Sequence, residues 1–163
     1  MTFNCGLLPK GEATDQLAEL VAERIWPGGG HTFGICRAIA VVDGDQLAAG
    51  LIYHNYDPDA GVVEISAAAW IKGWLTRPVL SVMYGYPFNS VGCQAVVQRV
   101  SDEDTAQHRM LTAYGFDRYR IPRLRGPAAA ENLFVLTREA WAGNNLRRLA
   151  RERAAQRKAA DGR

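Results

Sequence analysis

The residues best suited to catalysis or metal binding are spaced in a way that excludes several common sites. The three histidines lack the spacing of a metal site such as HxxxH with a nearby acid (His31, His54 and His108). The three cysteines are isolated and form no CxxC pair (Cys5, Cys36 and Cys93). This pattern argues against a zinc ribbon or a secreted disulfide framework and is typical of a reducing cytoplasm. No GxSxG, Walker loop or Ser/His/Asp arrangement occurs. We therefore expect no metal site.

One predicted strand, residues 62–70, could form the wall of a ligand site. Alternation along a strand places its side chains on two faces, one with Val63, Ile65, Ala67 and Ala69, the other with Val62, Glu64, Ser66, Ala68 and Trp70. The small side chains of residues 66–69 leave space above a sheet for a ligand or a helix. Residues 28–30 are all glycine but follow no strand, so we interpret them as a connector rather than a phosphate loop.

Helices and strands follow each other in an order that is typical of a mixed sheet covered by helices. Thr14 is expected to cap a helix that ends at Ile25, before Pro27. Thr76 is expected to cap a second helix, which ends near Tyr86. The remaining expected elements are strands at 35–42, 47–53, 62–70 and 94–100, a helix at 104–114 closed by Gly115, and strands at 119–124 and 132–137. The pattern predicts an α/β (α+β) fold with a mixed, mostly antiparallel, twisted sheet and helices on both faces.

The composition is that of a globular protein of one domain. The chain has 163 residues, of which 48% are apolar and 22% are charged. Nothing near residues 1–10 resembles a signal peptide, and no apolar run reaches the roughly 20 residues of a membrane helix. We therefore expect a soluble protein of the cytoplasm that makes no contact with membranes.

The C-terminal segment differs in charge from the rest of the chain. Residues 141–163 contain seven basic and two acidic side chains, a net charge of +5, although the whole chain carries only +2. We expect a domain at residues 1–141 and a basic tail at 142–163 that is helical or disordered. Such a tail either contacts nucleic acid weakly or is a solvated helix.

The order of elements and several local motifs resemble those of the GNAT acetyltransferases. Val100-Ser101-Asp102-Glu103-Asp104 followed by Tyr114-Gly115-Phe116 is similar to the family's fifth strand and the helix after it. The stretches Arg118–Arg125 and Asn132–Arg138 resemble the two closing strands. Residues 74–93 are similar to small acetyltransferases of phages and prophages. The likeness spans about residues 35–141 and is strongest to the branch that acetylates ribosomal-protein N-termini. A phage protein would work in the host cytoplasm.

The resemblance implies that the cosubstrate is acetyl-CoA. In the family, backbone N–H groups at the start of the helix after the fourth strand bind the CoA pyrophosphate. The family pattern falls on residues 72–77, where Lys72 supplies a cation while Leu75 and Arg77 replace small residues. Thr76 and Arg77 could bind phosphate with their side chains. The alternative is that Lys72 and Arg77 are only exposed charges. Ala67 and Ala69 complete the expected cosubstrate site.

Two further positions depart from the family. Asp104 stands where the family has an asparagine that contacts the pantetheine arm, and a carboxylate cannot donate the amide's hydrogen bond. Leu111 stands where many members have the tyrosine that protonates the departing thiolate.

Acetyl transfer to an amine needs a base, an oxyanion donor and protonation or stabilisation of the thiolate, and the resemblance suggests candidates for each. Glu64, on the strand that corresponds to the family's fourth, is the predicted base; otherwise it is an exposed strand residue. Backbone N–H groups after the small residues could polarise the thioester. Tyr84 is the predicted acid, with Tyr86 and Tyr119 as alternatives, and each could instead be a packing residue. Tyr53 and His54 are predicted to shape the acceptor pocket together with Tyr56.

Three functions remain compatible with these residues. The first is acetyl transfer to a primary amine of a small molecule or a protein N-terminus. The second is modification of a nucleobase by the same fold, with the basic tail holding phosphates. The third is a degenerate GNAT protein that binds CoA or a partner without catalysis, which the residues at positions 75, 77 and 111 suggest. The sequence does not identify the acceptor, and a homodimer is one expected assembly.

Overall fold

The computed structural model describes residues 1–162, except for the side chains of residues 145–150. The chain divides into two compact units, Met1–Gln98 and Arg99–Arg163. The first unit contains strands β1 (Phe3–Leu7), β2 (Arg37–Asp43), β3 (Gln46–Asp57) and β4 (Val62–Ala69) and the first residues of β5 (Ala95–Ser101), with helices α1 (Glu12–Ile25) and α2 (Arg77–Gly85) and the π-helical turn η1 (Tyr86–Val91). The second unit contains the end of β5, α3 (Thr105–Tyr114), β6 (Asp117–Gly126), β7 (Ala129–Thr137), α4 (Arg138–Gly143) and α5 (Asn145–Asp161).

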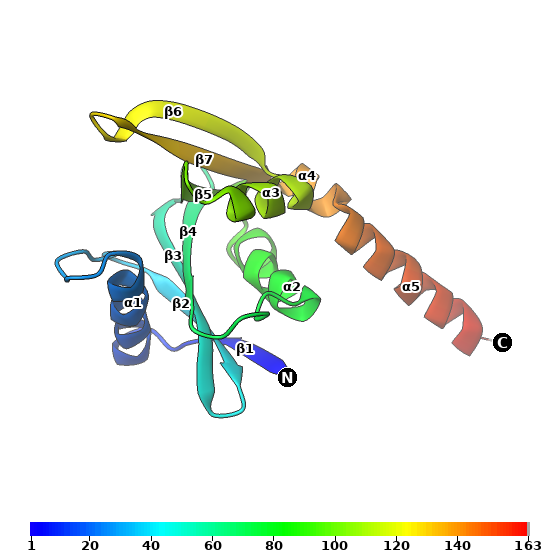
Figure 1. Ribbon diagram of the computed structural model, residues 1–163. Helices are drawn as coiled ribbons and strands as arrows, with labels where there is room; N and C mark the ends of the chain where they lie inside the picture. The colour runs from blue at the N-terminus through cyan, green and yellow to red at the C-terminus, as the bar shows by residue number, and fades with distance from the viewer. Residues whose placement is uncertain (163) are drawn as a thin grey trace. The chain divides into compact units, whose positions relative to one another are not determined.

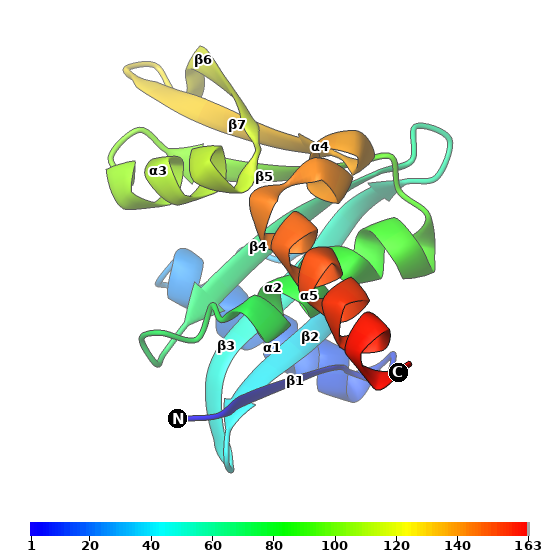
Figure 2. The ribbon, with the colours of Figure 1, turned by 90° about the vertical axis from the view of Figure 1, so that its right-hand side faces the viewer.

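The strands of the first unit form a sheet in the order β1-β2-β3-β4-β5. All neighbours are antiparallel except β4 and β5, which are parallel. Helix α1 lies on one face of these strands and α2 on the other (Figure 1), and α2 stands in front of them when the molecule is turned (Figure 2). The predicted fold class, a mixed and mostly antiparallel sheet with helices, is confirmed.

Helix α1 approaches the sheet closely because β3 has a glycine beneath it. A Cβ atom built on Gly50 would lie 2.6 Å from Cγ2 of Val21 and 2.9 Å from Cδ1 of Leu17. Leu17 and Val21 are buried there against Ala38 and Ile52 of the sheet. Two other apolar residues of α1, Leu20 and Ile25, are exposed.

The structure corrects two details of the predicted elements in this unit. Strand β1 was not expected, because only part of its short sequence is apolar. Helix α1 begins at Glu12, and the hydroxyl of Thr14 does not cap it but donates to the carbonyl oxygen of Pro9 at 2.7 Å. Helix α2 ends at Gly85 with Tyr86 as its C-cap, as predicted, and the chain then forms η1. The cap of α2 is confirmed, since Oγ1 of Thr76 accepts from the N–H of Val79.

In the second unit, β6 and β7 form an antiparallel hairpin, and α3 ends at Gly115 as predicted, while Asp104 precedes the helix as its N-cap. Oδ1 of Asp104 accepts from the N–H of Gln107, and Gly115 closes the helix with φ +118°. Leu111 is buried in the interior, where it packs as a core residue. Residues 145–161 form α5, and the division into a domain at 1–141 and a tail at 142–163 stays a prediction.

Within the part of the chain that the structure describes, no helix is long and apolar enough to cross a membrane. Nor does any cluster of three or more His, Cys, Asp or Glu side chains there have the geometry to hold a metal ion.

Candidate functional site

The site is built on β4, whose two faces carry different chemistry. The register of β3 and β4 pairs Gly50 with Ala68, Ile52 with Ser66, and His54 with Glu64, so these side chains share the face that α1 covers. The intervening residues of both strands face α2, because successive side chains of a strand alternate. The division of β4 into two faces, predicted from alternation, is therefore confirmed.

On the α1 face, Glu64 lies in a small polar cluster. Its Oε2 accepts a hydrogen bond from Nδ2 of Asn55 at 2.9 Å, and its Oε1 is 3.9 Å from Nε2 of His54. The same His54 nitrogen lies 2.9 Å from Oγ of Ser66. The side chain of Glu64 is 16% exposed, so this carboxylate is mostly desolvated yet still reachable. A carboxylate in this position beside an imidazole can accept a proton from a bound amine.

A backbone irregularity in β3 places Asn55 over Glu64. The register of β3 and β4 shifts between His54 and Asp57, and Asn55 has φ +49°, which is uncommon for a residue other than glycine. Bulges of this kind redirect a side chain, here the amide that donates to Glu64.

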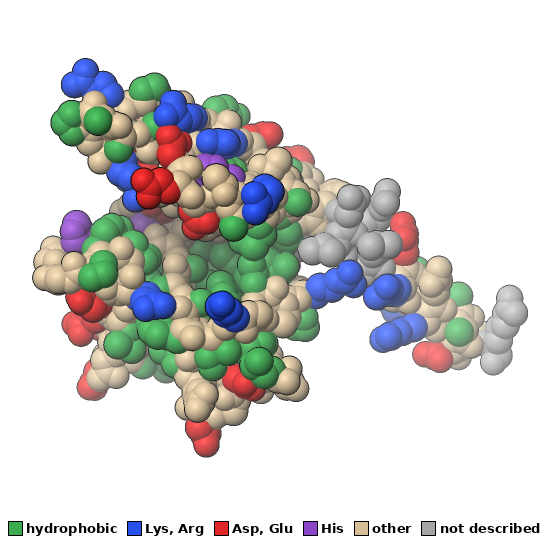
Figure 3. Space-filling view, viewed as in Figure 1, with side chains coloured by type: hydrophobic (Ala, Val, Ile, Leu, Met, Phe, Trp, Pro, Cys, Tyr) green, Lys and Arg blue, Asp and Glu red, His purple; other side chains and the backbone are tan. Residues whose placement is uncertain are grey.

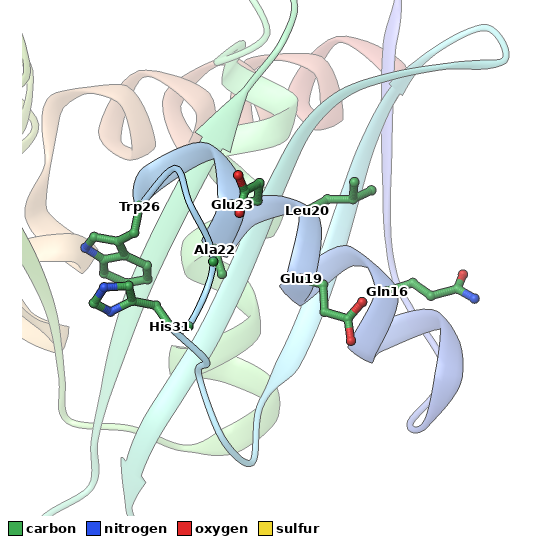
Figure 4. A pocket seen from close by; sticks show the side chains of 9 residues that line it. Gln16, Glu19, Leu20, Ala22, Glu23, Trp26 and His31 are labelled. Atoms are coloured by element: carbon green, nitrogen blue, oxygen red, sulfur yellow. The ribbon is translucent and has the colours of Figure 1, made fainter.

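A row of aromatic rings extends from the polar cluster to the surface. The ring of His54 is 4.8 Å from that of Phe33, Phe33 is 5.5 Å from Trp26, and Trp26 stacks on His31 at 4.9 Å. Trp26 and His31 line a cleft of about 590 Å³ that also contains Glu19 and Glu23 of α1 (Figure 4). Aromatic faces and carboxylates both attract cations, so this row suits an amine.

The α2 face carries the predicted acid. Tyr84 is 2% exposed, and its hydroxyl oxygen accepts a hydrogen bond from Nε2 of Gln98 at 2.9 Å. Ala67 and Ala69 lie on the same face of the sheet as Gln98, and their methyl groups take little space. The sheet thus separates Glu64 on one face from Tyr84 on the other.

The parallel pairing of β4 with β5 is short. The register runs from Val62 with Ala95 to Glu64 with Val97, whereas β4 continues for five residues, to Ala69. In the described chain no β5 partner faces residues 65–69, so this edge of β4 offers its backbone groups to a ligand. Strands β4 and β5 diverge after Glu64. A substrate at this edge of β4 could therefore contact side chains from both faces of the strand.

The loop after β4 has the properties of an anion site. Gly73 supplies its left-handed turn with φ +79°, and neither Leu75 nor Arg77 has a positive φ, so the departures from the family pattern cost no backbone strain. Leu75 is half-buried, while Lys72 and Arg77 are exposed. The described residues provide no hydrogen-bond acceptor for the N–H groups of Leu75 and Arg77. Free N–H groups at the start of a helix, with two cations beside them, fit a pyrophosphate.

The structure does not bring the two predicted acceptor residues into one pocket. Tyr53 and His54 are neighbours on β3 and so point to opposite faces. The hydroxyl of Tyr53 donates to the carbonyl oxygen of Met83 at 2.7 Å, and burial, with smaller contributions from nearby tyrosines, raises its pKa well above the usual value. Tyr53 lines a cavity with Tyr56, whereas His54 belongs to the polar cluster with Glu64.

Several residues of the site were not expected from the sequence. Ser66 was noted only for its small size, and the roles of Asn55 and Gln98 depend on contacts 9 and 14 residues away along the chain. The alternation of β4 could have signalled Ser66, because it places this residue on the same face as Glu64. The alternative acids differ in environment: Tyr86 packs edge-on against Tyr53, and Tyr119 is 55% exposed.

The order and pairing of the strands can be compared with those of solved structures. A chimera of the spermidine N-acetyltransferase SpeG from Vibrio cholerae and hSSAT superposes with a TM-score of 0.68 at 10% identity, over 87% of this chain and 99% of that one. The ribosomal-protein-S5-alanine acetyltransferase from Vibrio fischeri gives 0.64 at 12% identity, over 85% and 94% of the two chains. The chain has the GNAT acetyltransferase fold.

A dodecameric spermidine N-acetyltransferase from Vibrio cholerae shares the GNAT fold with this chain at a TM-score of 0.59 and 14% identity, over 79% of this chain and 77% of that one. No protein-family model matches the sequence, and no curated protein is significantly similar to it. The likeness therefore rests on the arrangement of the GNAT fold rather than on shared sequence.

Proposed function

We propose that this protein transfers an acetyl group from acetyl-CoA to a primary amine, with Glu64 as the base. The observation that carries the proposal is the position of Glu64, held by Asn55 and His54 at the point where β4 leaves β5. Bound acetyl-CoA supplies the acetyl group as an activated thioester. Positioning then accounts for much of the acceleration.

The loop at residues 72–77 would hold the pyrophosphate. The N–H groups of Leu75 and Arg77 donate to its oxygens, and the side chains of Lys72, Thr76 and Arg77 add charge and hydrogen bonds. Ala67 and Ala69 leave room for the pantetheine arm along the edge of β4. Asp104 is a further proposed contact, although its Oδ1 already caps α3.

On the α1 face, the proposed acceptor enters along the aromatic row. The amine reaches Glu64, and the carboxylate of Glu64 accepts a proton from its nitrogen. His54, whose Nε2 lies 3.9 Å from Oε1, helps to hold the Glu64 side chain in position. Backbone N–H groups on the edge of β4 donate to the developing oxyanion. On the other face, Tyr84 gives a proton to the departing thiolate, and Gln98 orients its hydroxyl.

The structural relatives suggest two acceptors to test, spermidine and a peptide that begins with alanine. We expect one of them, incubated with acetyl-CoA and the protein, to release free CoA and to gain the mass of one acetyl group. Glu64→Gln should lower kcat by about 10²-fold or more and leave CoA binding unchanged. Glu12→Gln, which alters an exposed carboxylate at the start of α1, is the matched control.

Binding of CoA without turnover on any amine would support a degenerate, non-catalytic protein instead. Normal turnover by Glu64→Gln would show that Glu64 is not the base and is only a strand residue.

A homodimer is a further proposal, which sedimentation of the full chain tests.

Weak contact with nucleic acid through the C-terminal helix is a proposal of its own. Basic side chains gather along the part of α5 that the structure describes (Figure 3), where Arg151, Arg153, Arg157 and Lys158 outnumber Glu152 and Asp161. We expect non-specific duplex binding at low salt that disappears as salt rises, through counterion release. Sequence-selective, salt-resistant binding would favour the nucleobase-modifying alternative.

A further inference from the structure

A second cavity of about 590 Å³ lies at the end of the first unit's sheet. It is lined by the loops that precede α1 and β2, the end of β3, the start of β4, and η1. Its volume is in the range of small-molecule sites. Among the residues that the structure describes, neither Glu64 nor His54 lines it.

The cavity contains a cation with an unsatisfied donor. Nη2 of Arg37 donates to the carbonyl oxygen of Leu8 at 3.2 Å, which fixes one end of the guanidinium. Nε of the same residue is buried and has no hydrogen-bond partner within the described chain. A buried N–H without an acceptor is costly, and an anionic ligand that draws the guanidinium toward it would supply one.

The other charged groups of the cavity also favour an anion. Lys10 adds a second positive charge, and Asp15 is the one acidic side chain among the described lining residues. Burial, and secondarily the charge of Asp15, raises the pKa of the Cys36 thiol, which therefore stays neutral. The balance is two cations against one carboxylate.

The walls are apolar and partly aromatic. Tyr53 and Tyr86 pack edge to face with centroids 4.9 Å apart, and Val63 and Pro87 are buried beside them. Tyr53 is 3% exposed and its hydroxyl is bonded to Met83, so it supports the ring of Tyr86, which is the more exposed of the two. A ligand here meets both aromatic surface and the side chain of Arg37.

We propose that this cavity binds a small organic molecule with one carboxylate on an aromatic body. The carboxylate pairs with Arg37 and Lys10, as guanidinium geometry favours, and the ring packs on Tyr86. The site requires neither acetyl-CoA nor turnover, so it is independent of the proposed acetyl transfer.

Phenylacetate is a suitable probe, with phenylacetamide as its neutral isostere. Titration of either compound into ¹⁵N-labelled full-length protein, without CoA, is followed by amide chemical shifts. We expect phenylacetate to shift the amides of Cys36, Tyr56 and Val91 and to bind at least tenfold more tightly than the amide. Arg37→Gln should weaken phenylacetate binding at least tenfold and have little effect on phenylacetamide.

Lys10→Gln keeps the test decisive if the Arg37 variant does not fold, because Lys10 is exposed. It should weaken phenylacetate binding severalfold. The matched control is Arg24→Gln, which removes a positive charge from the last turn of α1 and should change nothing. No shifts up to 10 mM phenylacetate, equal affinity for acid and amide, or unchanged binding by the folded Arg37 or Lys10 variants would overturn the proposal.

Discussion

Gln98 of β5 donates from Nε2 to the hydroxyl oxygen of Tyr84 in α2 at 2.9 Å, and both side chains are buried. A donor on a phenol oxygen stabilises the charged form that remains when the phenol gives up its proton. This pair therefore links α2 to the strand that diverges from β4, and it places a buried phenol on the side opposite Glu64.

The proposed acid can be tested with Tyr84→Phe, which keeps the ring and removes the hydroxyl. We expect kcat for acetyl transfer to fall by about 10²-fold with little change in CoA affinity, because general acid catalysis contributes that much in the transition state. Gln98→Leu should lower kcat by a smaller factor. If both variants keep the parent kcat, Tyr84 is a packing residue only. Tyr119→Phe, at an exposed position on β6, tests the alternative acid and should keep the parent kcat.

The anion loop makes a prediction about CoA affinity. Lys72→Ala and Arg77→Ala should each weaken CoA binding about tenfold, because each removes a charge-assisted contact to phosphate. Titration calorimetry with CoA measures this without any acceptor. Arg24→Ala, which removes an exposed charge from α1, should bind CoA like the parent protein. Parent-like binding by both loop variants would show that Lys72 and Arg77 are only surface charges.

Gly50 makes a prediction about stability. Its added methyl group would meet Val21 at 2.6 Å, and the β-branched valine has few other rotamers in a helix, so α1 must shift. We expect Gly50→Ala to lower the free energy of unfolding by about 1–3 kcal/mol, measured by urea denaturation. Gly6→Ala in β1 is the matched control, because nothing lies within 4 Å of the added atom and its φ is not positive. Equal stability of both variants would contradict the close packing of α1.

Most of the fold could be predicted from local signals. The hairpin turn around Gly44, the cap at Thr76 and the closing Gly115 all depend on residues close in sequence, and the structure has each of them. Strand β1 could not be predicted, because it is short and its residues are at most half-buried. The start of α1 was misplaced because Thr14 bonds backward to Pro9 rather than capping the helix.

Less of the candidate site could be predicted, because its contacts join distant segments. Alternation correctly placed Glu64 and Ala67 on opposite faces of β4. It could not reveal the bulge at Asn55, since this depends on the pairing of β3 with β4. The same alternation excludes a pocket shared by Tyr53 and His54, a constraint that their adjacency in sequence already contained.

The second unit makes a prediction about pH, centred on Asp102 at the end of β5. Its carboxylate accepts hydrogen bonds from Nε and Nη2 of Arg120 and, at 2.7 Å, from Nδ2 of Asn132. These bonds, with the nearby charges of Arg120 and Arg118, lower the pKa of Asp102 to about 2. The folded state therefore binds a proton at Asp102 less readily than the unfolded chain does, where an aspartate has a pKa near 3.9.

Because the folded pKa is depressed, the stabilisation from Asp102 is fully present above about pH 4 and is lost as the pH falls toward 2. We expect Asp102→Asn to be less stable than the parent at pH 7, and the difference in unfolding free energy to shrink between pH 4 and pH 2. Urea denaturation at a series of pH values measures it. Asp45→Asn, at an exposed position in the β2–β3 turn, is the control and should give no such trend. A difference that stays constant down to pH 2 would mean that Asp102 stabilises the unit through packing or neutral hydrogen bonds rather than through its charge.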